Sequence, residues 1–179
     1  VAITGGELLD YVALKVDKNG DVFTNYDLTD IETVNVIKFD ILGLKTMESI
    51  GDLRKSTGVT VDYDEAVKDK KILENFRLGN CDGIFQFEKK TARDILEKIH
   101  CDCFEDIVAA SSMNRPGPLS LKQPDLYAEN KYNIEEAKSS EYWEYTKESY
   151  GTIIYQEQVQ RICVNIGGLE WTDADKIMK

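Results

Sequence analysis

The sequence has no apolar run that approaches the length of about 20 residues that a membrane-spanning helix requires. It also shows no signal peptide, and its first residue is Val1 instead of an initiator methionine. Because these targeting segments are absent, we expect no association with a membrane and a cytoplasmic location.

Basic residues are scarce compared with acidic ones. The chain has 22 lysines and arginines against 33 aspartates and glutamates, which gives a net charge of −11 at pH 7. A protein that binds nucleic acid by itself needs lysine and arginine to contact the phosphates. The charge therefore argues against a self-sufficient nucleic-acid-binding domain, unless a larger enzyme supplies the basic surface from other parts of its chain.

Cysteines are few and poorly spaced for cross-links or structural zinc. Cys101 and Cys103 are too close together to bridge easily, and nothing indicates the disulfide framework of a secreted domain. A zinc site at His100–Cys103 would need a longer spacing between its cysteines and a second pair of ligands. We therefore expect ordinary core or surface thiols at all four cysteines, including Cys81 and Cys163.

The remaining composition is that of a globular protein, since 42% of the residues are hydrophobic and 31% are charged. A chain of 179 residues is long enough to bury one core, or a core plus an appended subdomain. The sequence contains no internal repeat and no low-complexity tract.

The N-terminal part carries the β signals. Apolar residues alternate in Tyr11–Val16 and in Val22–Tyr26, and the Asn-Gly pair between them is typical of a hairpin turn. A short helix or turn at Leu28–Thr33, with Thr29 as its N-cap, is expected next. A strand at Val34–Phe39 should then lead into Asp40.

From Leu42 onward the periodicity becomes helical. Apolar residues recur at the spacing of one helix face before Gly58, at Leu44, Met47, Ile50 and Leu53. We expect a rigid turn at Asn114–Pro118 and a loop at Lys131–Ser140. The sequence predicts an α+β fold, a small β-containing part followed by a mainly helical region, with further helices at Asp69–Phe76, Lys89–Ile99, Phe104–Met113, Leu119–Asn130, near Tyr142–Tyr145, at Ile153–Ile166 and from Thr172 onward.

Asp40 stands out because Lys38 lies two residues before it in an apolar segment. Alternate side chains of a strand point to opposite faces, so Lys38 and Asp40 share one face, while Phe39 lies on the other. Burial of such a pair requires a salt bridge, a metal or a phosphate. The pair suits a site where Asp40 holds a divalent cation and Lys38 meets an anionic substrate. The alternative is a solvated face of an antiparallel sheet.

Four segments follow one another in an order that carries a family resemblance. They are Lys38-Phe39-Asp40-Ile41-Leu42-Gly43-Leu44-Lys45, then Gly83-Ile84-Phe85-Gln86-Phe87-Glu88, then Cys103–Ala110 leading into Asn114–Leu119, and finally Tyr150–Val159. They resemble, in turn, the third-aspartate motif, the FQ-E segment, the CFED…RPGPL segment and the YGI-YQEQV segment of the C-family bacterial replicative DNA polymerases, the alpha subunits of DNA polymerase III. Four motifs in register make this resemblance strong.

The resemblance implies that residues 1–45 are the end of a palm domain with the third catalytic aspartate, and that residues 46–179 are part of a fingers domain. It implies a template-directed DNA polymerase that uses two Mg²⁺ ions, one of them held by Asp40. Two further aspartates of the family form an Asp-x-Asp pair upstream, and no segment before Asp40 offers that pair. We therefore expect the isolated chain to be inactive.

The resemblance also implies residues that contact nucleotide phosphates: Lys38, Lys176 and Lys179. Arg115 lies before Pro-Gly-Pro, in a turn whose stiffness would fix its guanidinium, and we expect it to contact a nucleotide or template phosphate. Met178 stands at one of the family's basic positions, which argues against a full triphosphate clamp. Arg115 alternatively caps the end of the preceding helix.

The polar run Gln156, Glu157 and Gln158 either faces the nucleotide site or forms a solvated helix face with internal hydrogen bonds. The expected partners of the complete enzyme are primer–template DNA, deoxynucleoside triphosphates and other replisome subunits. A second hypothesis, from another class, is a non-catalytic acidic helical domain that binds a basic protein partner.

Overall fold

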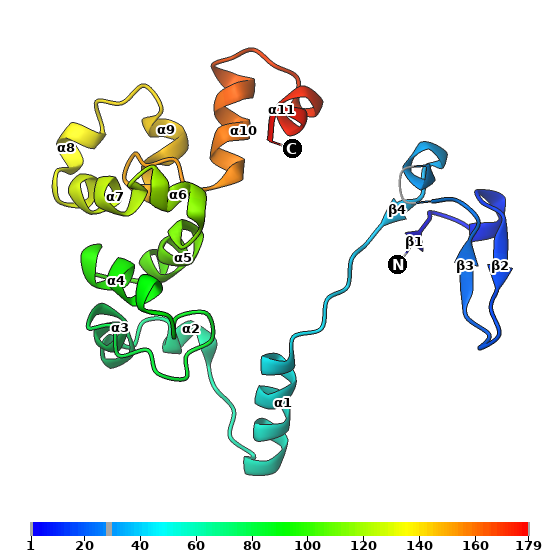
Figure 1. Ribbon diagram of the computed structural model, residues 1–179, viewed down its shortest axis with the longest axis horizontal. Helices are drawn as coiled ribbons and strands as arrows, with labels where there is room; N and C mark the ends of the chain where they lie inside the picture. Colours follow the sequence, from blue (N-terminus) through cyan, green and yellow to red (C-terminus); the bar gives the residue numbers. More distant parts are fainter. Residues whose placement is uncertain (1, 28–29, 179) are drawn as a thin grey trace. The chain divides into compact units, whose positions relative to one another are not determined.

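The computed structural model describes residues 2–27 and 30–178, and the chain forms two compact units, Val1–Val59 and Thr60–Lys179 (Figure 1). The first unit contains the β-strands, and the second is helical. The predicted α+β class with a mainly helical C-terminal region is confirmed, since the structure is 54% helical and its strands are few and short. The predicted division at residue 45 stays a prediction.

The first unit holds two separate two-stranded antiparallel sheets. Strands β2 (Leu14–Val16) and β3 (Val22–Thr24) form the predicted hairpin, with Leu14 opposite Thr24. The Asp17 carboxylate accepts hydrogen bonds from the turn amides of Asn19 and Asp21, at 2.8 and 3.0 Å. Strands β1 (Ala2–Ile3) and β4 (Ile37–Lys38) form the second sheet.

The strand predicted at Val34–Phe39 is wrong in its length. Only Ile37–Lys38 is a strand, because Val34 closes the 3₁₀ helix η2 (Ile31–Val34) and Asn35 takes a left-handed backbone with φ 59°. Val36 nevertheless enters the core of this unit with Val12 and Ile31. Leu28 and the predicted N-cap Thr29 lie outside the described residues. A second 3₁₀ helix, η1 (Leu8–Asp10), was not expected.

Helix α1 (Lys45–Thr57) confirms the helical pattern after Leu42. Gly58 ends it in a left-handed conformation with φ 68°, and its amide donates to the Arg54 carbonyl at 2.9 Å. The helix has no buried residue, and its apolar side chains Met47, Ile50 and Leu53 are exposed.

The second unit packs its helices around one core, in which α4 lies against α3, α5 and α7. Its largest buried side chains include Leu96, Ile99, Met113 and Tyr127. Asp69 caps α3 by accepting from the amides of Lys71 and Ile72. The helices of this unit are α2 (Tyr63–Ala66), α3 (Lys70–Arg77), α4 (Lys90–Lys98), α5 (Phe104–Met113), α6 (Pro116–Ser120), α7 (Gln123–Tyr132), α8 (Ile134–Ala137), α9 (Trp143–Thr146), the 3₁₀ helix η3 (Lys147–Ser149), α10 (Gln156–Asn165) and α11 (Trp171–Met178).

Three sequence predictions in this unit need correction. Pro116 begins helix α6 instead of continuing a turn, because its missing amide is no loss at a first helical position. The helix predicted at Leu119–Asn130 is divided at Lys122, whose backbone is left-handed with φ 55°. The loop predicted at Lys131–Ser140 contains the end of α7 and all of α8.

Two helix starts also differ from the prediction. Helix α10 begins at Gln156 instead of Ile153, and α11 begins at Trp171, one residue before the expected start. None of the helices among the described residues combines the length and the apolar character that crossing a membrane requires.

Candidate functional site

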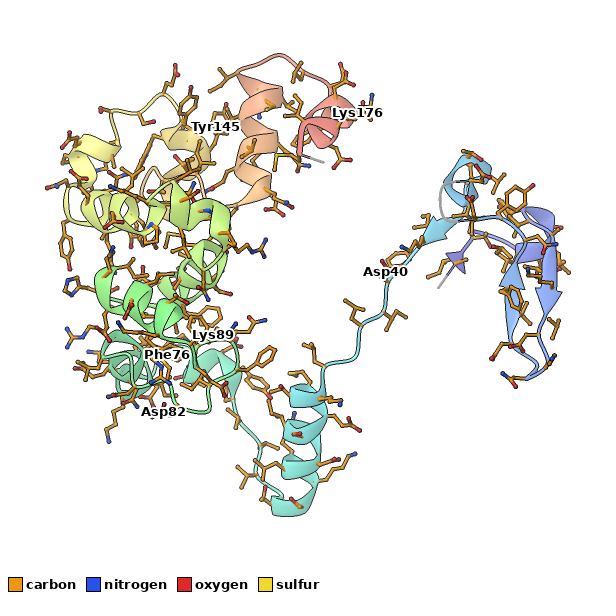
Figure 2. All side chains as sticks on the ribbon, viewed as in Figure 1. Asp40, Phe76, Asp82, Lys89, Tyr145 and Lys176 are labelled. Carbon is orange, nitrogen blue, oxygen red and sulfur yellow. The ribbon has the colours of Figure 1, made fainter. Side chains whose placement is uncertain are left out.

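Lys38, the last residue of β4, and Asp40, two residues later, form an exposed ion pair in the first unit. The Lys38 Nζ atom lies 3.1 Å from Oδ2 of Asp40, and 36% and 65% of the two side chains are exposed. Figure 2 labels Asp40 on the extended segment that follows this strand. This ion pair agrees with the expectation that the side chains of Lys38 and Asp40 point to the same side of the chain. Because exposed ion pairs are weak, either partner is free to exchange the other for a ligand.

The Asp40 carboxylate is the hard oxygen ligand that Mg²⁺ prefers, and solvent reaches it. It is, however, one ligand. Within residues 2–27 and 30–178, the sole group of three clustered metal-binding side chains is Asp102, Cys103 and Asp106, which does not include Asp40. The residues present therefore fit a contribution of one carboxylate to a magnesium site, and no more.

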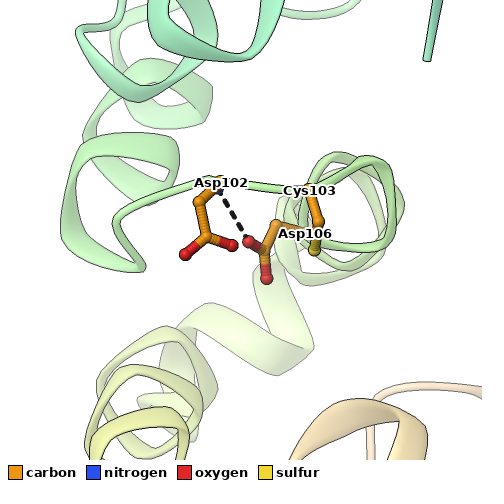
Figure 3. A group of neighbouring side chains, drawn as sticks. All are labelled: Asp102, Cys103 and Asp106. Atoms are coloured by element: carbon orange, nitrogen blue, oxygen red, sulfur yellow. Dashed lines mark hydrogen bonds between the residues drawn. The ribbon is translucent and has the colours of Figure 1, made fainter. Parts of the chain in front are cut away.

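Figure 3 shows the cluster of Asp102, Cys103 and Asp106. Its two carboxylates pair with a lysine of the chain itself. The Lys131 ammonium lies 2.7 Å from Asp106 and 3.1 Å from Asp102. The Asp106 carboxylate also accepts from the Tyr127 hydroxyl at 2.9 Å and from the Asp102 amide at 3.0 Å. This arrangement satisfies a fully buried carboxylate without a metal.

Electrostatics agree with a structural role for that cluster. Burial alone would raise the pKa of Asp106, but the hydrogen bonds from Lys131 and Asp102 bring it below its ordinary value. Burial alone would lower the pKa of Lys131, but the two carboxylates raise it. Burial raises the pKa of the Cys103 thiol to about 12, so a thiolate ligand is disfavoured there.

Arg115 lies on a cleft in the second unit. The cleft has a volume of about 440 Å³ and is lined by Phe85, Gln86, Glu88, Lys89, Ser111, Asn114 and Arg115. It therefore joins the FQ-E segment to the start of the RPGPL segment. Arg115 is the N-cap residue of α6 and is exposed. Among the residues that the structure describes, its guanidinium makes no hydrogen bond or ion pair, including any to the end of α5.

The polar run of α10 is divided between surface and interior. Gln156 and Glu157 are exposed, whereas Gln158 is fully buried. The Gln158 side-chain oxygen accepts from the amides of Ile154 and Tyr155, at 2.9 and 3.0 Å, and its amide nitrogen donates to Ser149 at 2.7 Å. Gln158 thus holds the start of α10 and, because it is fully buried, does not face a ligand site.

Lys176 lies on α11, where Figure 2 labels it, and its ammonium pairs with Asp173 at 2.8 Å. Three quarters of its side chain is exposed, so this pair too is open to exchange. Lys179 lies outside the described residues. The structure brings Lys38 to Asp40, and Arg115 to the FQ-E segment, but these two groups belong to different units, each described by itself.

Sequence reasoning missed two residues of the cleft, Lys89 and Ser111. Both are immediate neighbours of residues already noted, since Lys89 follows Glu88 and Ser111 follows Ala110. Their position beside a motif was the available signal. The network of Lys131 with Asp106 was also missed, because Lys131 was placed in a loop.

The helical unit thus carries on one cleft two of the segments that resemble motifs of the DNA polymerase III alpha family, as a fingers domain of that family would. Residues 43–179 match the family model described as the bacterial DNA polymerase III alpha subunit finger domain. The chain belongs to the family of DNA polymerase III alpha subunits.

Whole-chain comparison gives the same family. The chain is 34% identical over its full length to the DNA polymerase III subunit alpha of Aquifex aeolicus and covers 16% of that protein. It is 35% identical over 91% of its length to the protein of that name from Helicobacter pylori, of which it covers 14%. For the Rickettsia prowazekii protein the identity is 32% over the whole chain, which covers 16% of it. The chain thus spans about a sixth of the length of the curated relatives it matches.

Proposed function

We propose that this chain is the end of the palm and part of the fingers of a template-directed DNA polymerase, which adds deoxynucleotides to a primer 3′ end. The observation that carries the proposal is the exposed carboxylate of Asp40, within a chain that belongs to the DNA polymerase III alpha family. Residues 1–45 would belong to the palm and residues 46–179 to the fingers. In the complete enzyme the partners would be primer–template DNA, deoxynucleoside triphosphates and replisome subunits, in the cytoplasm.

Asp40 is the residue of this chain that would hold Mg²⁺, together with carboxylates from elsewhere in the complete polymerase. Bound Mg²⁺ supplies a lowered pKa at the attacking primer hydroxyl and neutralises the leaving pyrophosphate. The Lys38 ammonium, 3.1 Å from Asp40, would meet a phosphate oxygen of the incoming nucleotide. Arg115 and Lys176 would add phosphate contacts from the fingers.

The test is primer extension by the complete polymerase that contains this segment, with Asp40→Asn compared with wild type. The amide keeps the shape of the side chain but removes the charge that holds the ion, so extension should be lost. Asp10→Asn is the matched control, since Asp10 is an exposed aspartate of the same unit at the end of η1. Near-normal extension by Asp40→Asn would assign Asp40 a structural role only.

A further inference from the structure

We infer that Gln158 is a positioning residue, which fixes the direction in which helices α10 and α11 leave the rest of the helical unit. It acts through buried hydrogen bonds at the start of α10, and the residue that it positions is Lys176 on α11. The inference rests on the proposed function for the role of Lys176 as a phosphate contact. It gives Gln158 a part in nucleotide use, although its side chain meets no ligand.

Helices α10 and α11 form a pair within the helical unit (Figure 1). The most extensive contacts of α11 are with α10, and α10 packs in turn on α9. The direction of the pair therefore depends on the place where α10 begins. This place is the connecting segment between η3 and α10, residues 150–155.

Most of the buried polar side chains lie at this place. Among the described residues, five polar or charged side chains are buried, and four of them are here: Thr146, Ser149, Thr152 and Gln158. Apolar side chains can slide over one another, whereas hydrogen bonds hold only within a narrow range of distances and angles. A buried polar contact therefore specifies one direction for the helix that follows it.

Gln158 makes the hydrogen bonds that connect α10 to what precedes it. Its side-chain oxygen accepts from the amides of Ile154 and Tyr155, at 2.9 and 3.0 Å, which caps the start of the helix. Its side-chain nitrogen donates to the Ser149 hydroxyl, nine residues earlier, at 2.7 Å. The Ser149 hydroxyl donates in turn to the Thr152 carbonyl at 2.6 Å. The bond to Ser149 goes beyond capping, because it ties α10 to the 3₁₀ helix η3.

Helix α7 holds the same connecting segment from another side. The Gln123 side-chain nitrogen donates to the Ile153 carbonyl at 2.7 Å. The Asn130 side-chain nitrogen lies 3.5 Å from the Thr152 hydroxyl. The segment is thus fixed to α7, and Gln158 fixes α10 to the segment.

The length of α10 makes its direction important for Lys176. The helix has 10 residues and is therefore about 15 Å long. A tilt of about 10° at its start would move its far end by roughly 2.5 Å, which is more than a hydrogen bond to a phosphate oxygen tolerates. Lys176 pairs with Asp173 on its own helix, so the place of its ammonium depends on where α11 lies.

Residual dipolar couplings of the backbone amides of the isotope-labelled chain measure the directions of the helices. In wild type we expect one alignment tensor to fit α5, α7, α10 and α11. Ser149→Ala removes the tie to η3 but leaves the cap of α10, so the couplings of α10 and α11 should shrink or require a second tensor. Gln158→Met removes all three bonds at similar side-chain volume and should show a larger change. The matched control is Ser139→Ala, since Ser139 is an exposed serine of the same unit whose hydroxyl donates to the Glu136 carbonyl.

Steady-state incorporation of one nucleotide by the complete polymerase measures the consequence for activity. Ser149→Ala should lower kcat/KM for the incoming deoxynucleotide about tenfold, because a phosphate contact is displaced. In a Lys176→Ala background the same change should cost less than about twofold, because the ammonium that it displaces is absent. Ile99→Val, which trims the apolar core of the same unit, should keep wild-type kinetics. A loss that comes from stability alone would instead be equal in both backgrounds.

Two results would overturn the inference: wild-type couplings of α10 and α11 in Ser149→Ala, or an equal loss of kcat/KM with and without Lys176. Wild-type kinetics in Lys176→Ala alone would instead remove the proposed phosphate contact of Lys176. Altered couplings would in that case still support Gln158 as the residue that directs α10, and unaltered couplings would overturn it. The couplings need neither Asp40 nor catalysis, so failure of the proposed function is distinguishable from failure of this inference.

Discussion

The Lys131 ammonium lies 2.7 Å from the carboxylate of Asp106, a residue with no exposed surface. The same ammonium donates to the carbonyl of His100 at 3.2 Å, in the loop after α4. One lysine of α7 thus joins α5 and the end of α4. The Tyr127 hydroxyl, one helical turn before Lys131, completes the shell of the carboxylate. The core that supports the cleft therefore depends on a buried ion pair as well as on apolar packing.

Lys131→Met should destabilise the second unit by about 3–5 kcal/mol, because it leaves the buried Asp106 carboxylate without its counter-charge. Urea denaturation, monitored by far-ultraviolet circular dichroism, measures the change. Lys138→Met is the control, since Lys138 pairs with Glu135 on the surface of the adjacent helix, and its loss should cost less than about 1 kcal/mol. Equal stabilities of the two variants would contradict the assigned role of the buried pair.

The same pair predicts the pH dependence of stability. The pKa of Asp106 is lowered in the folded chain, so its contribution is present above the ordinary aspartate range and is lost as pH falls through the folded pKa. The pKa of Lys131 is raised, so its contribution is present below the ordinary lysine range and is lost as pH rises through the folded value. The free energy of unfolding of the second unit should therefore be constant across neutral pH and fall at both acidic and basic pH.

Urea midpoints measured across a range of pH check this. In Asp106→Asn the fall in stability at acidic pH should be less steep than in wild type. An unchanged acid limb would show that other carboxylates dominate.

Lys38→Ala in the complete polymerase should lower kcat/KM for the incoming deoxynucleotide. A lost hydrogen bond between charged groups is worth about 1.5–3 kcal/mol, which corresponds to roughly 10- to 150-fold. Lys18→Ala, in the exposed turn of the hairpin, is the control and should leave kcat/KM unchanged. Steady-state incorporation of a single nucleotide gives both values, and equal values for Lys38→Ala and wild type would remove Lys38 from the site.

The isolated chain should bind primer–template DNA weakly and should not extend it. Its net charge of −11 repels a duplex at long range, and the residual binding should weaken further as salt rises. Fluorescence anisotropy with a labelled primer–template at two salt concentrations measures the affinity. Sub-micromolar binding at physiological salt would mean that the chain presents a concentrated basic face. Extension above a control without protein would mean that the chain needs no further metal ligands.

The parts of the fold that the sequence predicts are those set by local chemistry. The hairpin follows from Asn19 and Gly20, and α1 follows from its apolar spacing and Gly58. The predicted strand and helix boundaries are wrong at Asn35 and Lys122. These non-glycine residues take left-handed backbone conformations that the hydrophobic pattern does not predict. Lys131 was assigned to a loop because its neighbours are polar, whereas its burial depends on Asp106, which is distant in sequence.

The sequence predicts individual residues of the candidate site that lie in motifs, but not how these residues are arranged in space. Asp40 and Lys38 are indicated both by their spacing on a strand and by a family motif, and Arg115 lies in another motif. That Lys89 and Arg115 share one cleft depends on how α4 and α5 pack, which periodicity does not specify. Gln158 shows that a motif residue need not belong to a binding site. It is polar and was a candidate for the nucleotide site, but it is buried and its hydrogen bonds stabilise the fold.

The most direct test of the account is the single-turnover rate of nucleotide incorporation by the complete polymerase, measured against Mg²⁺ concentration for wild type, Asp40→Asn and Asp10→Asn. If Asp40 is a ligand of the catalytic metal, Asp40→Asn should show little or no incorporation at any Mg²⁺ concentration, while Asp10→Asn follows the wild-type curve. A wild-type rate and Mg²⁺ dependence in Asp40→Asn would contradict the account, because the ion would then be held without the Asp40 carboxylate.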